Sequence, residues 1–140
     1  MEQLTLPGTL DSLDDLRRYI RTAAQDAGLP KKFAYRLQLA VDEIAANAVI
    51  HGYNNAGIHG ALRAQAIIDA QNLTITLEDD GHPFDPRTVP APTHKELPIE
   101  ERPIGGLGVY LTLKGVDEFH HDDAGGCNRN IFIMKRRERE

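Results

Sequence analysis

The sequence has few of the features that mark disulfide frameworks, metal clusters, membrane spans or nucleic-acid binders. Its single cysteine, Cys127, cannot form an internal disulfide or build a thiolate cluster for zinc, which favours a reducing compartment. The apolar runs are too short for a membrane span, and the first residues do not resemble a signal peptide. Acidic residues outnumber basic ones by 21 to 16, and the net charge of −5 argues against binding to nucleic acid or an anionic membrane. We therefore expect a soluble, cytoplasmic protein.

The rest of the composition is that of an ordinary globular domain. The 140 residues are 41% hydrophobic and 26% charged, which excludes disordered and fibrous classes. This length suits a single domain, so we expect residues 1–140 to form one unit with its own core.

Hydrophobic periodicity predicts both helices and strands. Alternation of apolar and polar residues predicts strands over 3–6, 62–70, 72–79, 116–121 and 131–134. Helical spacing predicts helices over 12–27 and 30–52, a loop over 53–57, and a third helix that begins near Leu107. Because the elements do not alternate strictly as in βαβ units, we predict an α+β fold, a two-layer sandwich with a mixed, mostly antiparallel sheet.

The second predicted helix carries three polar residues on one stripe. Glu43, Asn47 and His51 are four residues apart, and each four-residue step drifts by only about 40° around a helix. The stripe borders the apolar face, where an unpaired polar group costs about 1–3 kcal/mol. Glu43 and Asn47 could line a polar cleft for a metal, phosphate or water, or they could brace neighbouring loops; the spacing alone does not decide between these readings.

An acidic residue ends the strand predicted over 72–79. Asp79 shares the strand face of Leu73, Ile75 and Leu77, so it lies on the core side unless the strand stops one residue earlier. In a buried register it would accept hydrogen bonds from a group that enters the layer. Gly81, two residues later, would let a flat ligand approach the backbone closely.

Prolines gather between this strand and the third predicted helix. A connection as long as 86–104 in a small domain is more often a lid or binding loop than a simple linker. It leads into Gly105, Gly106, Leu107 and Gly108, and backbone N–H groups at such a helix entry can hold phosphate oxygens. Taken alone this signal is weak, because neither a Walker A loop nor a dinucleotide fingerprint is present.

The three clusters together resemble the GHKL (histidine-kinase-like) ATPase superfamily and, within it, the bacterial anti-sigma factor serine/threonine kinases. Residues 39–52 resemble the family's N box, 79–86 its first glycine box, and 97–111 its lid end and second glycine box. The similarity extends from about residue 4 to 135. One departure is Pro83, which stands where many superfamily members have a second glycine, although the anti-sigma subgroup shares this form.

The resemblance implies an ATP site between the helical layer, the lid and the sheet. It implies that Asn47 ligates Mg²⁺, that Asp79 accepts from the adenine amine, and that Gly81 lets the base approach. The glycine-rich entry, with Gly105, Gly106, Leu107 and Gly108, would hold the phosphates, and Glu43 would be the general base. Either Asn128 or Asn130 could face the nucleotide, and Arg102 could reach a phosphate.

The resemblance also implies the partners. They are a small anti-anti-sigma antagonist protein, phosphorylated on serine or threonine, and a sigma factor that the chain holds inactive; homodimerisation is plausible from the family. Two alternatives remain open at this point. The chain could be a regulatory module that binds nucleotide or a partner without transferring phosphate, or its target could be another signalling protein.

Overall fold

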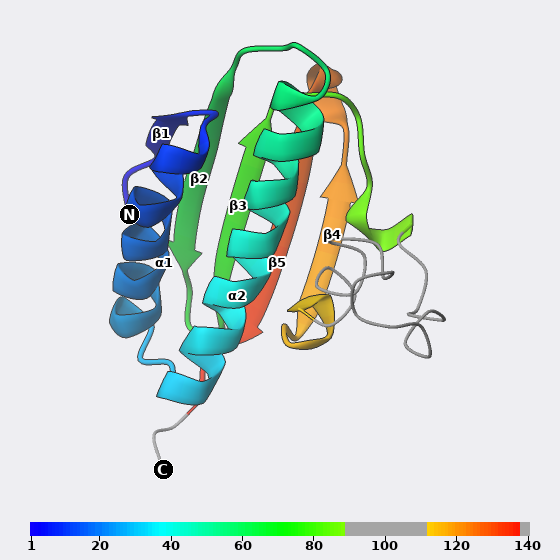
Figure 1. Ribbon diagram of the computed structural model, residues 1–140. Helices are drawn as coiled ribbons and strands as arrows, with labels where there is room; N and C mark the ends of the chain where they lie inside the picture. The colour runs from blue at the N-terminus through cyan, green and yellow to red at the C-terminus, as the bar shows by residue number, and fades with distance from the viewer. Residues whose placement is uncertain (89–111, 138–140) are drawn as a thin grey trace, which may run out of the picture.

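The computed structural model describes residues 1–88 and 112–137, which form two layers. Two helices, α1 (Leu13–Asp26) and α2 (Lys31–Asn47), cover one face of a sheet (Figure 1). The sheet has the order β1-β2-β3-β5-β4, and every neighbouring pair is antiparallel. Its strands are β1 (Leu4–Pro7), β2 (Ala61–Ile68), β3 (Asn72–Asp79), β4 (Glu118–Asp122) and β5 (Asn128–Lys135). The predicted α+β sandwich is therefore confirmed.

The core lies between the helices and one face of the sheet. Leu16 and Ile20 of α1 and Leu37 and Val41 of α2 are each at most 1% exposed, as helical spacing predicts. They pack against alternate residues of the central strands, such as Ile75 of β3, and burial of that apolar surface stabilises the sandwich. Among the described helices, none combines the length and apolar composition that a membrane span requires.

The second helix continues beyond its α-helical part. It changes at Asn47 into a π-helix, η2 (Ala48–Asn54), so the predicted helical end near Gly52 and the loop predicted from Tyr53 are both misplaced. Tyr53 is the cause, because its ring is 1% exposed and is held inside the sandwich by tertiary contacts. π-Helical segments are rare and occur frequently at functional sites.

Strand boundaries also differ from the prediction by one to three residues, and two of the differences have a clear consequence or cause. The strand predicted over 62–70 ends at Ile68, because the carboxylate of Asp69 accepts hydrogen bonds from the backbone N–H groups of Gln71 and Asn72 (2.8 and 2.7 Å) and forms the β2–β3 turn. The last strand begins at Asn128 instead of 131. This extension places Asn128 and Asn130 on the same strand face as the buried Phe132 and Met134.

The predicted lid and third helix fall largely outside the described residues. Of the lid over 86–104, residues Pro86–Thr88 form a short 3₁₀ helix, η3. Of the helix predicted from Leu107, residues 112–114 are helical.

Candidate nucleotide site

A cavity opens where the end of α2 meets the ends of β3 and β5. Its described lining comes from the helix end, the last residue of β3, the loop that follows β3, and the start of β5. These residues are Ile44, Asn47, Ala48, His51, Gly52, Asp79, His82, Phe84, Pro86, Asn128 and Asn130. Its volume of about 90 Å³ is small beside the roughly 300–1,000 Å³ of typical ligand sites, so these residues suit a flat ring better than a whole nucleotide.

Asp79 is the buried carboxylate of this cavity. It is 2% exposed, which confirms that it faces the core from the end of β3. Its Oδ1 accepts from the backbone N–H of Gly81 and from the side-chain amide of Asn128, both at 2.9 Å. Its Oδ2 has no hydrogen-bond partner within residues 1–88 and 112–137. Burial raises the pKa of Asp79, although these two hydrogen bonds oppose the shift.

The two asparagines of β5 both reach the cavity wall, but they are bonded differently. Asn128 donates to Asp79 and to the carbonyl oxygen of His82 (3.2 Å), and it accepts from the backbone N–H of Phe84 (3.1 Å). Its amide therefore fixes the loop after β3. Oδ1 of Asn130 lies within hydrogen-bond distance, 2.9 Å, of Nδ1 of His121. The alternation along β5 was the sequence signal that could have placed both on one face.

Gly81 makes a close backbone contact, with the end of the helix. A Cβ atom at Gly81 would lie 2.8 Å from the carbonyl carbon and oxygen of Gly52. The carbonyl oxygen of Gly52 also accepts from the N–H of His82 at 3.0 Å. The requirement for glycine at 81 thus has an explanation within the protein, in addition to the predicted approach of a flat ligand.

Tyr53 anchors the π-helix to the sheet, and the sequence analysis missed it. Its ring lies against Gly8 and Gly60, where a Cβ would come within 2.6 and 2.7 Å of ring carbons. Its hydroxyl donates to the carbonyl of Ala61 and accepts from the N–H of Asp80, both at 2.7 Å. Burial raises the pKa of the Tyr53 hydroxyl. No local pattern indicates this role, because Tyr53 lies in a stretch rich in Gly and Asn.

Glu43 lies one turn before Asn47 on α2 and does not belong to the cavity lining given above. It is half-buried, and burial followed by repulsion from neighbouring Asp42 raises its pKa. Asp42 itself is held by Arg17, whose Nε donates to Oδ1 at 2.9 Å. A carboxylate with a raised pKa beside a cleft is suited to accept a proton.

Asn47 is the residue best placed to meet a metal–phosphate group. It is half-buried, lines the cavity, and its side chain makes no hydrogen bond within the described part of the chain. The same ranges contain no group of three His, Cys, Asp or Glu side chains that could form a metal centre of their own. Mg²⁺ commonly takes one or two protein oxygens, with water and phosphate oxygens completing its shell, so a single Asn47 oxygen fits it.

The structure thus brings together Asn47, Asp79 and Gly81 from the predicted site, with Glu43 one helical turn away. The remaining predicted positions, Arg102, Gly105, Gly106, Leu107 and Gly108, lie outside the described residues.

Comparison with known families shows the class of protein. Residues 6–134 match the model of the histidine kinase-like ATPase domain. The match covers nearly the whole chain, and the two-layer sandwich agrees with it. The chain therefore belongs to the histidine kinase-like ATPase domain family.

Relatives with assigned names indicate a more specific group within this family. The chain is 28% identical over 122 residues to the serine-protein kinase RsbW of Bacillus licheniformis, covering 81% of this chain and 76% of the relative. It is 29% identical over 101 residues to an anti-sigma F factor of Clostridium acetobutylicum, covering 71% of this chain and 68% of the relative. These similarities support the resemblance to anti-sigma factor kinases.

Solved structures with the same fold are more distant in sequence. The histidine kinase domain of the blue-light activated histidine kinase from Erythrobacter litoralis EL346 superposes with a TM-score of 0.54 at 19% identity over 89% of this chain. This chain spans 59% of that structure. The histidine kinase AdeS of Acinetobacter baumannii gives a TM-score of 0.50 at 11% identity over 99% of this chain and 70% of its own. Both similarities concern the fold.

Proposed function

We propose that residues 1–140 form one ATP- and Mg²⁺-dependent protein serine/threonine kinase domain of the anti-sigma type, with a lid over 86–104. It phosphorylates a small anti-anti-sigma antagonist protein and binds a sigma factor. Two findings support this proposal: the chain belongs to an ATPase family, and its relatives include a serine-protein kinase and an anti-sigma factor.

The observation that carries the proposal is the unused oxygen of Asp79. A carboxylate that is 2% exposed, with Oδ2 lacking a partner in the described part of the chain, is costly for folding. An exocyclic amine is the complementary donor, and adenine carries one. Because Oδ1 is fixed by Gly81 and Asn128, Oδ2 is oriented before the base arrives.

The phosphates of ATP are assigned to Asn47 and to the glycine-rich entry. Asn47 would hold the Mg²⁺, and the backbone of Gly105, Gly106 and Gly108 would donate to phosphate oxygens. The metal supplies neutralisation of the charge on the phosphates. Asn47 contributes position: it is fixed where α2 changes to the π-helix.

Glu43 is assigned as the general base for transfer. The hydroxyl oxygen of the substrate serine or threonine forms a bond to the γ-phosphorus, the bond from that phosphorus to the β–γ bridging oxygen breaks, and ADP leaves. Glu43 takes the hydroxyl proton. Burial of Glu43 raises its pKa and so makes it a better proton acceptor. The phosphate adds about −1.5 to −2 charges to the antagonist, which weakens its docking by repulsion.

An isosteric change at Asp79 tests the base-binding role. In Asp79→Asn the amide oxygen can keep the bonds from Gly81 and Asn128, while an N–H₂ group replaces the free Oδ2. We expect ATP affinity, measured by calorimetry, to fall at least about tenfold, because two donors then face each other. Inosine triphosphate carries an acceptor oxygen in place of the amine. Its affinity for Asp79→Asn, relative to wild type, should therefore fall less than that of ATP, or rise.

The matched control is Asp80→Asn, which changes the neighbouring exposed acid that pairs with Arg63. It should leave nucleotide affinity unchanged. Equal ATP affinity of wild type and Asp79→Asn would show that Asp79 does not read the base.

Transfer itself is tested with ATP labelled at the γ-phosphate and lysate of the native organism, with phosphosites identified by mass spectrometry. Glu43→Gln should bind ATP but transfer at least about 100-fold more slowly, as expected for loss of a general base. Glu118→Gln, which changes an exposed acid on the edge strand β4, is the control. Labelling that persists in Glu43→Gln would remove Glu43 from the mechanism, and ATP binding without any labelled protein would favour the non-catalytic regulatory module.

A further inference from the structure

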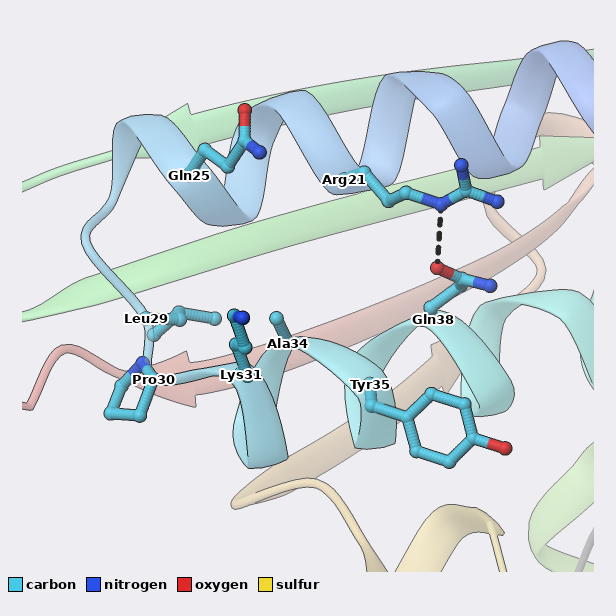
Figure 2. Close-up of a pocket in the computed structure, with 8 residues that line it drawn as sticks. All are labelled: Arg21, Gln25, Leu29, Pro30, Lys31, Ala34, Tyr35 and Gln38. Atoms are coloured by element: carbon cyan, nitrogen blue, oxygen red, sulfur yellow. Dashed lines mark hydrogen bonds between the residues drawn. The ribbon is translucent and has the colours of Figure 1, made fainter.

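A second concave surface lies at the other end of the helical layer. It is a groove of about 730 Å³ between the C-terminal half of α1 and the N-terminal half of α2. Figure 2 shows Arg21 of α1 opposite Gln38 of α2 at one end of the groove, and Lys31 and Ala34 of α2 near Leu29 at the other end. On α2 the groove is lined by residues from Lys31 to Gln38, whereas the cavity lining begins at Ile44, so the two lie on different halves of the helix.

The groove is positive in a chain of net charge −5. Arg21 and Lys31 line it, and its described lining contains no acidic residue. Arg21 donates from Nε to Oε1 of Gln38 at 3.1 Å, and within the described ranges its guanidinium meets no carboxylate. Arg17, one turn earlier on the same helix, pairs with Asp42 and Asp14. Carboxylates of the described part of the chain thus neutralise the charge of Arg17 but not that of Arg21.

The stability of α2 does not account for the basic residues at its start. Lys31 and Lys32 occupy the first turn, that turn has no acidic residue, and Pro30 provides no side-chain cap. Positive charge at a helix N-terminus opposes the helix dipole, so Lys31 weakens the helix unless an anion lies nearby. Lys32 differs, because its Nζ lies 5.3 Å from the centre of the Phe33 ring in a cation–π contact.

The groove also offers apolar contacts. Leu29 is 6% exposed and Ala34 is partly buried, so they give it an apolar floor. Tyr35 is 60% exposed, and its hydroxyl has no hydrogen-bond partner within residues 1–88 and 112–137. Tyrosine and arginine are among the residues that most often anchor protein interfaces.

We propose that this groove docks an acidic segment of a partner protein, with carboxylates at Arg21 and Lys31 and an apolar side chain against Leu29, Ala34 and Tyr35. The apolar floor favours a peptide with an apolar side chain over a nucleic-acid backbone, which is bound chiefly through its phosphates. Because the groove and the cavity lie on different halves of α2, a segment bound in the groove does not block the cavity. The proposal does not depend on kinase activity.

Fluorescence anisotropy of the full chain tests it with a labelled peptide of alternating Leu and Glu-Glu units, and with the same peptide carrying Gln for every Glu. We expect the acidic peptide to bind, with affinity falling as salt screens the charges, and the Gln peptide to bind at least about tenfold more weakly. Lys31→Glu and Arg21→Glu should each weaken the acidic peptide about tenfold or more, and Tyr35→Ser should weaken both peptides.

The controls separate docking from folding and from general charge. Lys31→Glu should raise thermal stability, because it places an acid at the helix N-terminus, so lost binding in that variant is not lost structure. Arg18→Glu makes the same charge change on α1 outside the groove and should leave binding unchanged. Absence of binding at about 1 mM peptide, equal binding of the Gln peptide, an equal effect of Arg18→Glu, or preference for a short DNA duplex would each overturn the proposal.

Discussion

An aspartate lies at each end of β3, and the two have different surroundings and different roles (Figure 1). Asp69 precedes the strand and Asp79 ends it, and each carboxylate accepts two hydrogen bonds through Oδ1, at least one of them from backbone N–H. The pKa of Asp69 is lowered, chiefly by the N–H groups of Asn72 and Gln71, while the pKa of Asp79 is raised, chiefly by burial. Burial, and not the number of hydrogen bonds, makes the difference.

The surroundings of the two aspartates differ in the same way. At the Asp69 end, Arg136 donates to the carbonyl oxygens of Ala27 and Asp69 (3.0 and 2.8 Å) and ties α1, the β2–β3 turn and the end of β5 together. At the Asp79 end, a buried oxygen is left without a partner among the described residues. One end is organised for stability, whereas the other keeps a costly group where a ligand can bind.

The largest effect should come from Gly81→Ala at the cavity end. Its Cβ would meet the backbone of Gly52 at 2.8 Å, which side-chain movement cannot relieve, so we expect the free energy of unfolding to fall by about 2–3 kcal/mol. Nucleotide affinity should fall with it. Gly57→Ala is the control: its φ of +68° costs about 1 kcal/mol, but its Cβ would meet nothing within 4 Å. Urea denaturation of both variants measures the difference, and equal losses would contradict the role of the Gly52–Gly81 contact.

A smaller loss should follow from Arg136→Gln at the opposite end. The variant loses two hydrogen bonds from a charged donor to backbone carbonyls near the surface, and we expect about 1–2 kcal/mol of destabilisation. Nucleotide affinity should stay unchanged, since the cavity is at the other end of the sheet. Lys135→Gln, whose side chain makes no bond in the described structure, serves as the control. A large loss of nucleotide affinity in Arg136→Gln would break the comparison between the ends.

The smallest effect should be a gain in stability from Asp79→Asn. The raised pKa means that the folded state holds the Asp79 proton more tightly than the unfolded state, so ionisation of Asp79 destabilises the fold. The variant should therefore melt about 2–5 °C higher at neutral pH. The gain should shrink as the pH falls through the raised pKa of Asp79, where the wild type becomes protonated. Differential scanning calorimetry at about pH 3 to 8 measures the difference in melting temperature between the variant and the wild type. A gain that does not depend on pH would argue against burial of the Asp79 carboxylate as the cause.

Periodicity predicted most of the fold. The alternation around Ile75 and the helical spacing of Leu16, Leu37 and Val41 identify the buried faces, because each element must turn its apolar side to the core. The same argument placed Asp79 inside. The helix end was predicted wrongly, because two of the contacts that fix Tyr53 come from Gly8 and Asp80, which are far from Tyr53 along the chain.

The sequence by itself therefore determined the sandwich, the polar stripe of α2 and the buried position of Asp79, since all three follow from residue spacing within one element. Only the tertiary structure decided how Asp79 is bonded, why Gly81 must be small, and that Arg21 of α1 contacts Gln38 of α2 and no carboxylate among the described residues. These properties depend on pairs such as Asp79–Asn128 and Gly52–Gly81, whose members belong to different elements. Local spacing carries no information on such pairs, because packing of the two layers brings them together.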